Sequence, residues 1–341
     1  MNKTWKELLC MVLSAVMVLG LAACGSSKAE ASAGDGDSTS GDTAADSIVL
    51  KMSTAHLIEQ GTNGAVTVKM YFANSLGAQD VIVQGLMDGS IDLSLEFIDS
   101  TYNPVFEVPS LPFIASNFDE MEYIFSPGSQ VYSLVDKGFS DIGIKLLGVY
   151  CEGLTGVSCK NMPESYNTWD QKKEPIRVWN SAVAKAGMTA MGYNTVAMTW
   201  SDTYSSIQTG IVNGSVGQTS LGVYTNLRDV VNYFIPYNFG AEFVHLAMSS
   251  TSWGKLTADQ QKVVQDAATQ VCKEIFDSAE QTEADGFAML KEAGIEVLEL
   301  SDADRSAIAQ HVREEVWPAQ EEILGKEAMD AIYADLKACA K

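Results

Sequence analysis

The chain contains one helix–glycine–strand pattern twice, and this repeat constrains the fold more than any other feature of the sequence. The segment "LMDGSIDLSL" (86–95) aligns without a gap with "IQTGIVNGSV" (207–216). In each copy a helix should end at a glycine that can adopt the left-handed conformation, and a short buried strand should follow. The aligned positions are Gly89 with Gly210, Ile91 with Val212, Asp92 with Asn213, and Ser94 with Ser215. Chance similarity is the alternative, but two units in one register predict two lobes built on a common plan.

Strand and helix patterns alternate along most of the chain. Its 341 residues are enough for two lobes of about 100–150 residues each. Such alternation predicts an α/β fold with a mostly parallel sheet in each lobe and helices on the faces of the sheets. The predicted strands include "SIVLKMS" (47–53), "AVTVKMYF" (65–72), "IKLLGVY" (144–150), "IRVW" (176–179) and "GIEVLEL" (294–300).

Capping residues mark the starts of three predicted helices, the second of which is long and amphipathic. The predicted starts are Ser181, Thr257 (with Gln260 completing a capping box) and Ser301 (with Asp304). The last of these helices should end at Trp317-Pro318, because proline cannot continue the helical hydrogen bonds.

The N-terminus has the features of an export signal. Lys3 and Lys6 precede an apolar run over residues 8–19, which is too short to span a membrane comfortably. The sequence "LAAC" that ends at Cys24 resembles the lipobox of bacterial lipoproteins, which implies a signal peptide over residues 1–23 and lipid attachment at Cys24. A plain secretory signal is the alternative. Residues 24–47 contain too little apolar surface to fold and predict a flexible linker.

The formal net charge of −22 narrows the range of ligands. Nucleic-acid binding needs a basic face and is therefore not expected. An anionic small molecule would meet a repulsive overall field, so a site for such a ligand needs a local positive group.

The familiar catalytic and metal-binding motifs are absent from the sequence, so we expect no enzyme activity, no cofactor and no metal. The three histidines, His56, His245 and His311, are widely spaced. Cys151 and Cys159 flank a predicted turn. In an exported protein they can form a disulfide or remain two buried thiols.

The segment "EPIRVWNSAVAKAGMTAMGYNTVAMTWSDTYSSIQTGIVNGS" (174–215) resembles the signature region of TRAP transporter substrate-binding proteins of the dicarboxylate-binding type. "DGSIDLSL", "LPF" (111–113) and "SSTSWGKLTADQQKVVQDAA" (249–268) are similar to the same family. The resemblance implies a two-lobed, periplasmic-binding-protein-like fold with a long helix bridging the lobes. It also implies an extracytoplasmic receptor that delivers its ligand to TRAP membrane permease subunits.

The resemblance also divides the chain into lobes. We expect lobe I over 48–149 and 243–282, lobe II over 150–242 and 283–310, and C-terminal helices over 311–341. The chain should cross between the lobes near residues 149–152 and 238–245, and the lobes should close on the ligand.

The predicted ligand anchor is Arg177, which occupies the place of the family's ligand-pairing arginine at the end of a strand. An arginine fork matches a carboxylate in bidentate fashion. The alternative is a structural arginine paired with an acidic neighbour. Trp200 matches an aromatic residue that closes over ligands in the family, and a core tryptophan is its alternative. We also assign Gln218, Asp99, Tyr102, Trp179 and Phe239 to the ligand-binding cleft.

The sequence departs from the family pattern in two places. Thr155 and Gly156 stand where many members carry a second arginine, so we expect a small organic acid held by a single carboxylate. The connection over residues 55–65 is short for a helical crossover. A bare loop can close it and leave one sheet face exposed, the first strand can be displaced, or the sequence can derive from a deletion.

Two other functions compete with this receptor. The first is the solute-binding lipoprotein of an ATP-driven transporter, which the "IQTGIVNG" block disfavours. The second is an extracytoplasmic hydrolase that uses Asp99, Glu152 or Glu242 as acid or base, for which the sequence offers no paired constellation.

Overall fold

The computed structural model describes residues 46–72 and 75–339, and for residues 46–53 it describes the main chain alone. The predicted signal peptide, the Cys24 lipidation site and most of the predicted linker lie outside these residues and stay predictions from the sequence. Within the described ranges, no helix combines the length and the apolar character that crossing a membrane requires.

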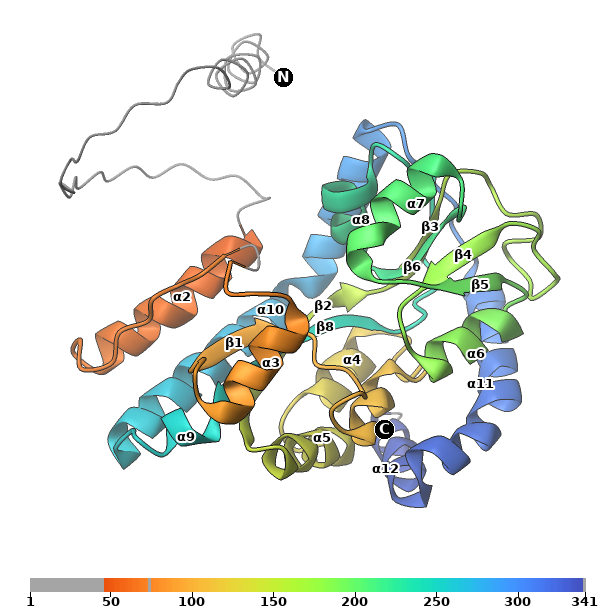
Figure 1. The fold of residues 1–341 in the computed structure, drawn as a ribbon. Coiled ribbons are helices and arrows are strands. Elements are labelled where there is room, and N and C mark those ends of the chain that lie inside the picture. The colour runs from red at the N-terminus through yellow and green to blue at the C-terminus, as the bar shows by residue number, and fades with distance from the viewer. Residues whose placement is uncertain (1–45, 73–74, 340–341) are drawn as a thin grey trace, which may run out of the picture. The chain divides into compact units, whose positions relative to one another are not determined.

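Helices and strands alternate through the described chain (Figure 1). The helices are α2 (Asp46–Gly61), α3 (Gln79–Asp88), η2 (Pro104–Ser110), α4 (Phe118–Phe125), α5 (Gln130–Asp141), α6 (Ala182–Ala190), η3 (Trp200–Asp202), α7 (Thr203–Thr209), α8 (Ser220–Leu227), α9 (Ser250–Trp253), α10 (Ala258–Glu292), α11 (Asp302–Leu324) and α12 (Lys326–Cys339). The strands are β1 (Leu93–Glu96), β2 (Ile144–Leu154), β3 (Gly156–Cys159), β4 (Pro175–Val178), β5 (Asn194–Ala197), β6 (Gly214–Gln218), β7 (Tyr233–Ile235), β8 (Ala241–Ser249) and β9 (Glu296–Val297).

Two sheets organise the described chain into two lobes. The first lobe holds a three-stranded sheet in the order β1-β8-β2, and the second a six-stranded sheet in the order β5-β4-β6-β3-β7-β9. In the second sheet β4 runs parallel to β5 and β6, whereas β3 runs antiparallel to both of its neighbours. In the first sheet β8 is antiparallel to both β1 and β2, so the prediction of a mostly parallel sheet is wrong for this lobe.

The first lobe lacks the two strands predicted at its start, and this explains its antiparallel sheet. Residues 47–53 lie in α2, and residues 65–72 are extended but pair with no strand. Side chains satisfy amides there in place of a sheet ladder, since Val68 N donates to Glu59 Oε1 (2.9 Å) and Val66 N to Thr62 Oγ1 (3.1 Å). Ile58 of α2 is buried against the sheet. The structure therefore has neither a bare-loop crossover nor a displaced first strand, because residues 47–53 are helical and residues 65–72 form no strand.

Two extended segments and one helix connect the lobes. β2 ends at Leu154 and β3 begins at Gly156, while Thr155 pairs with the return segment through its N–H to the Gly240 carbonyl (2.9 Å) and its carbonyl to the Phe239 N–H (3.0 Å). α10 runs from β2 in the first lobe to α8 in the second, as Figure 1 shows, which confirms the predicted bridging helix.

Three apolar clusters hold these elements together. The main core spans both lobes on one face of the sheets and includes Val149, Val157, Ile176, Val178, Val216 and Phe243. The lobe I cluster includes Ile58, Leu147, Tyr150, Leu246, Met248 and Val264. The lobe II cluster includes Ile207, Val212, Val223, Leu227, Phe234 and Leu290. Only the main core is continuous across the crossing between the lobes, and this leaves a break in the apolar packing on the other face.

The repeated unit has the predicted local structure in both copies. Gly89 ends α3 with φ 82°, and Gly210 ends α7 with φ 80°, a conformation that a side chain would strain. β1 follows the first glycine and β6 the second, and the two strands belong to different sheets. Each lobe therefore contains one copy of the unit.

The predicted caps are confirmed, whereas the predicted end of α11 is wrong. Ser181, Thr257 and Ser301 each accept a main-chain N–H at their helix starts. α11 continues through Pro318 to Leu324. Tertiary packing holds this segment, because Trp317 is buried and its Nε1 donates to the Pro112 carbonyl (2.9 Å).

Cys151 and Cys159 are free, buried thiols. They lie on β2 and β3, which are separated by the single residue Thr155 and not by the predicted turn. The structure therefore has the buried-thiol alternative.

Candidate functional site

Arg177 lies on β4, on the face of the second sheet that is turned away from the main core. Ile176 and Val178 on either side of it belong to the main core, and side chains along a strand alternate between faces. Its register partner on β6 is Ser215, where Val216 again belongs to the main core. The strand therefore carries Arg177 to the face on which the apolar packing is interrupted between the lobes.

The Arg177 guanidinium is buried without a counter-ion. The residue is 4% exposed, its Nε donates to the Met198 carbonyl (3.2 Å), and its Cζ lies 5.6 Å from the centre of the Trp200 ring. Burial lowers the pKa of Arg177 to about 10, and no acidic side chain among the described residues forms an ion pair with it. A buried cation with no anion is costly unless a partner arrives. The alternative of a structural ion pair is therefore not what the structure contains.

Trp200 is 43% exposed and begins the short helix η3. The alternative of a core tryptophan is therefore wrong. Its ring stacks with the Arg177 guanidinium and remains available to cover a bound molecule.

Trp179 directly follows β4, and Gln218 is the last residue of β6, the parallel strand beside it. The Trp179 ring covers Gly217, where an added Cβ would lie 2.8 Å from the ring, so the glycine permits this close approach. Gln218 is buried, its Nε2 donates to the Val216 carbonyl (3.3 Å), and its Oε1 has no partner among the described residues. An unpaired buried acceptor of this kind calls for a donor.

Two glutamates lie where the strands cross between the lobes. Glu242 Oε2 accepts the Thr219 N–H (2.6 Å) just beyond the end of β6. Burial, together with the negative charge of Glu152, raises the pKa of Glu242 to about 8. The sequence predicted these residues only for the hydrolase alternative. Their place beside β6 depends on the way β2 and β8 leave the first lobe.

The other predicted site residues lie elsewhere. Asp99 and Tyr102 follow β1 in the first lobe, where Asp99 Oδ1 accepts the Thr101 N–H (2.9 Å). Burial and the charge of Asp99 raise the pKa of Tyr102. Phe239 packs in the main core, with its ring 5.6 Å from that of Phe113. The structure thus joins Arg177 with Trp200, places Trp179 and Gln218 near them on the second sheet, and puts the Phe239 side chain in the core.

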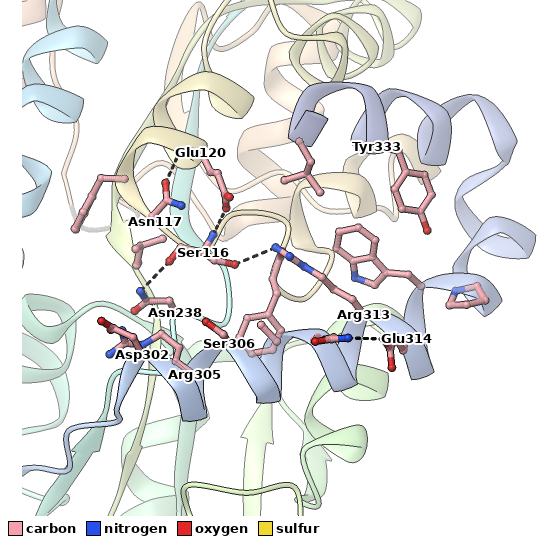
Figure 2. Close-up of a pocket in the computed structure, with 18 residues that line it drawn as sticks. Ser116, Asn117, Glu120, Asn238, Asp302, Arg305, Ser306, Arg313, Glu314 and Tyr333 are labelled. Atoms are coloured by element: carbon pink, nitrogen blue, oxygen red, sulfur yellow. Dashed lines mark hydrogen bonds and ion pairs between the residues drawn. The ribbon is translucent and has the colours of Figure 1, made fainter. Parts of the chain in front are cut away.

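A pocket of ≈ 1130 Å³ lies between α11, α12 and the segment that precedes α4 (Figure 2). Its arginines are occupied by the protein itself. Arg313 donates to the Phe113 carbonyl (2.7 Å) and Ser116 Oγ (3.0 Å), and Arg305 donates to the Pro236 carbonyl (3.2 Å) and pairs with Asp302. These cations are therefore less suited to capture an anion than Arg177 is. None of the predicted site residues lines this pocket.

In the described part of the chain, no group of three or more histidine, cysteine, aspartate or glutamate side chains is placed to hold a metal ion.

The comparisons with known proteins agree with this architecture. The C4-dicarboxylate-binding periplasmic protein DctP of Rhodobacter capsulatus is 23% identical over 285 residues, which cover 82% of this chain and 83% of that protein. A TRAP periplasmic solute binding protein from Desulfovibrio salexigens with bound orotic acid has a TM-score of 0.75 and 21% identity, covering 86% of this chain and 94% of the other. The sugar acid binding protein DctPAm from Advenella mimigardefordensis in complex with galactonate has a TM-score of 0.76 and 20% identity, covering 85% and 93%.

These similarities confirm the predicted two-lobed, periplasmic-binding-protein-like α/β fold. A family model described as bacterial extracellular solute-binding protein, family 7, matches residues 44–322. The chain therefore belongs to the bacterial extracellular solute-binding proteins of family 7.

Proposed function

We propose that the protein is an extracytoplasmic receptor that captures a small organic acid between its lobes by one carboxylate. The observation that carries this proposal is the buried Arg177, whose guanidinium has no acidic partner among the described residues. A ligand carboxylate would supply the missing charge through two parallel hydrogen bonds. Trp200 would then cover the bound group from the exposed side.

The similar proteins support an acidic ligand. Their names and bound molecules include a C4-dicarboxylate, orotic acid and galactonate. Among the described arginines, Arg177 alone is both buried and without an ion pair, and in a chain with a net charge of −22 this favours one carboxylate over two.

We further propose that the loaded receptor delivers its ligand to the membrane subunits of a TRAP transporter. The structures to which the chain is similar include a protein described by that name. Uptake into vesicles that contain both membrane subunits should require the receptor, and uptake that is equal without it would rule out delivery. The lipid anchor at Cys24 remains a prediction from "LAAC", which an unmodified Cys24 in the mass spectrum of the mature protein would refute.

A thermal-shift screen tests the proposed ligand class directly. Each organic acid is compared with its own primary amide, so that the carboxylate is the single difference. A ligand that binds the native state at 100 times its Kd adds about 2.7 kcal/mol of stability. We expect at least one acid to raise the melting temperature and its amide to have no effect. Equal stabilisation by acid and amide, or stabilisation by neutral sugars alone, would contradict the proposal.

A further inference from the structure

Arg177 and Glu242 lie on the same side of the molecule, on the face turned away from the main core. Phe243 next to Glu242 belongs to the main core, whereas Val244 packs on the lobe I cluster, so Glu242 shares the face of Val244. The break in apolar packing at the crossing between the lobes therefore carries a cation on one side and a carboxyl on the other.

The sheet register orders Arg177, Trp179 and Glu242 along β6, and Trp179, which is partly buried, also packs against the main core. Arg177 is level with Ser215 on β6, the Trp179 ring covers Gly217, and Glu242 binds the N–H of Thr219. These three positions follow one another two residues apart along β6, and the register shift at Gly217 interrupts the alternation of faces there, so the register fixes their order along the strand. The four steps from Ser215 to Thr219 span ~13 Å at ~3.3 Å each. An apolar ring thus separates a positive end from an acidic end.

The acidic end contains two carboxyl groups. Gly153 of β2 pairs with Glu242 of β8, and the register shift just before Gly153 leaves Glu152 as an extra residue beside this pair. Glu152 and Glu242 are both partly buried. Two neighbouring carboxylates resist ionising together, and a cation between them removes that repulsion. Burial is the larger cause of the raised pKa of Glu242, and the negative charge of Glu152 adds to it.

We propose that the ligand is zwitterionic, with its carboxylate on Arg177, its body on the Trp179 ring, and a protonated amine at Glu152 and Glu242. This inference rests on the receptor function proposed above and narrows its ligand class to amino carboxylic acids. Capping of α8 through Thr219 is the other role open to Glu242, and it needs one oxygen and no charge.

Matched pairs of ligands isolate the contribution of the amine. The probes are α-amino acids and the ω-amino acids from 3-aminopropanoate to 6-aminohexanoate, each beside the same acid without its amine. We expect amine-bearing members to stabilise the protein and to bind at least about tenfold more tightly than their partners, a difference of ~1.4 kcal/mol. Thermal shift ranks the probes, and calorimetry measures the affinity of the best pair.

Three variants locate the effect. Glu242→Gln keeps an oxygen for the Thr219 N–H but loses the charge, so the preference for the amine should fall about tenfold or more. If Glu242→Gln fails to fold, Glu152→Gln takes its place in the test and should reduce the same preference for the amine. Glu283→Gln is the matched control, because Glu283 is another partly buried carboxyl whose pKa burial raises, to about 7, and it should leave the preference unchanged.

Failure of this inference is distinguishable from failure of the receptor function. If acids without an amine bind as tightly as their amine-bearing partners, or if the glutamine variants keep the preference for the amine, the proposal of a zwitterionic ligand is wrong. If that binding is lost in Arg177→Ala, the receptor function still stands. If no acid of either set binds in an Arg177-dependent way, both proposals fall.

Discussion

Replacing Arg177 by lysine is expected to weaken binding of the best acid from the screen by roughly 30-fold or more. Lysine keeps the positive charge but loses the planar fork that meets both oxygens of a carboxylate. Truncating one partner of a buried charge pair typically costs ~2–5 kcal/mol, and each ~1.4 kcal/mol is tenfold in Kd. Isothermal titration calorimetry of the purified variant measures the change.

The matched control for this substitution is Arg228→Lys. Arg228 also lies over an aromatic ring, 5.0 Å from the centre of Tyr224, and donates to a main-chain carbonyl (3.0 Å), but it is solvent-exposed. Its replacement should leave affinity unchanged. Because lysine keeps the buried charge that Arg177 already carries without an ion pair, Arg177→Lys should change the melting temperature of the free protein little. Equal affinity for wild type and Arg177→Lys, with both folded, would show that Arg177 does not hold the ligand.

Replacing Trp317 by alanine is expected to lower the free energy of unfolding by ~3–5 kcal/mol, the usual cost of truncating a buried large aromatic residue. Trp317 joins α11 to the first lobe, because its buried Nε1 donates to the Pro112 carbonyl. This packing accounts for the continuation of α11 through Pro318. Urea denaturation followed by circular dichroism measures the change.

Trp169→Ala is the control for this second prediction. Trp169 is 44% exposed and stacks on His311 of α11, with the ring centres 4.5 Å apart. Trp169→Ala should therefore lower the free energy of unfolding by only about 1 kcal/mol. A loss from Trp317→Ala that is no larger than this would mean that Trp317 does not anchor α11.

Features that depend on a few neighbouring residues were predictable from the sequence. A serine or threonine cap is decided by the next three residues, and a glycine at a helix end by its own backbone freedom, so Ser181, Thr257, Gly89 and Gly210 were predicted correctly. The end of α11 was not, because the burial of Trp317 against a segment some 200 residues away outweighs the local effect of proline.

The first lobe was the least predictable part of the fold. The β-branched segments at 47–53 and 65–72 have strand propensity, but a strand also needs a partner. The short connection between them leads instead to α2 and an extended segment whose amides bind side chains. Local propensity alone does not distinguish these outcomes.

The candidate site divides in the same way. Arg177 was identified from its motif and from the need for a positive group in an acidic chain, and the structure adds that it has no acidic partner among the described residues. The place of Glu242 beside Thr219 depends on residues far apart in the chain that meet where β8 passes the end of β6. Phe239 was assigned to the cleft, whereas its side chain lies in the main core.

A crystal structure of the complex with the most strongly stabilising acid tests the central claim most directly. We predict that both oxygens of one ligand carboxylate accept hydrogen bonds from the Arg177 guanidinium at 2.7–2.9 Å, the range of charge-assisted bonds. Trp200 should lie against the bound group. A ligand seated with its carboxylate elsewhere, for example on Arg305 or Arg313 in the pocket beside α11, would contradict the account.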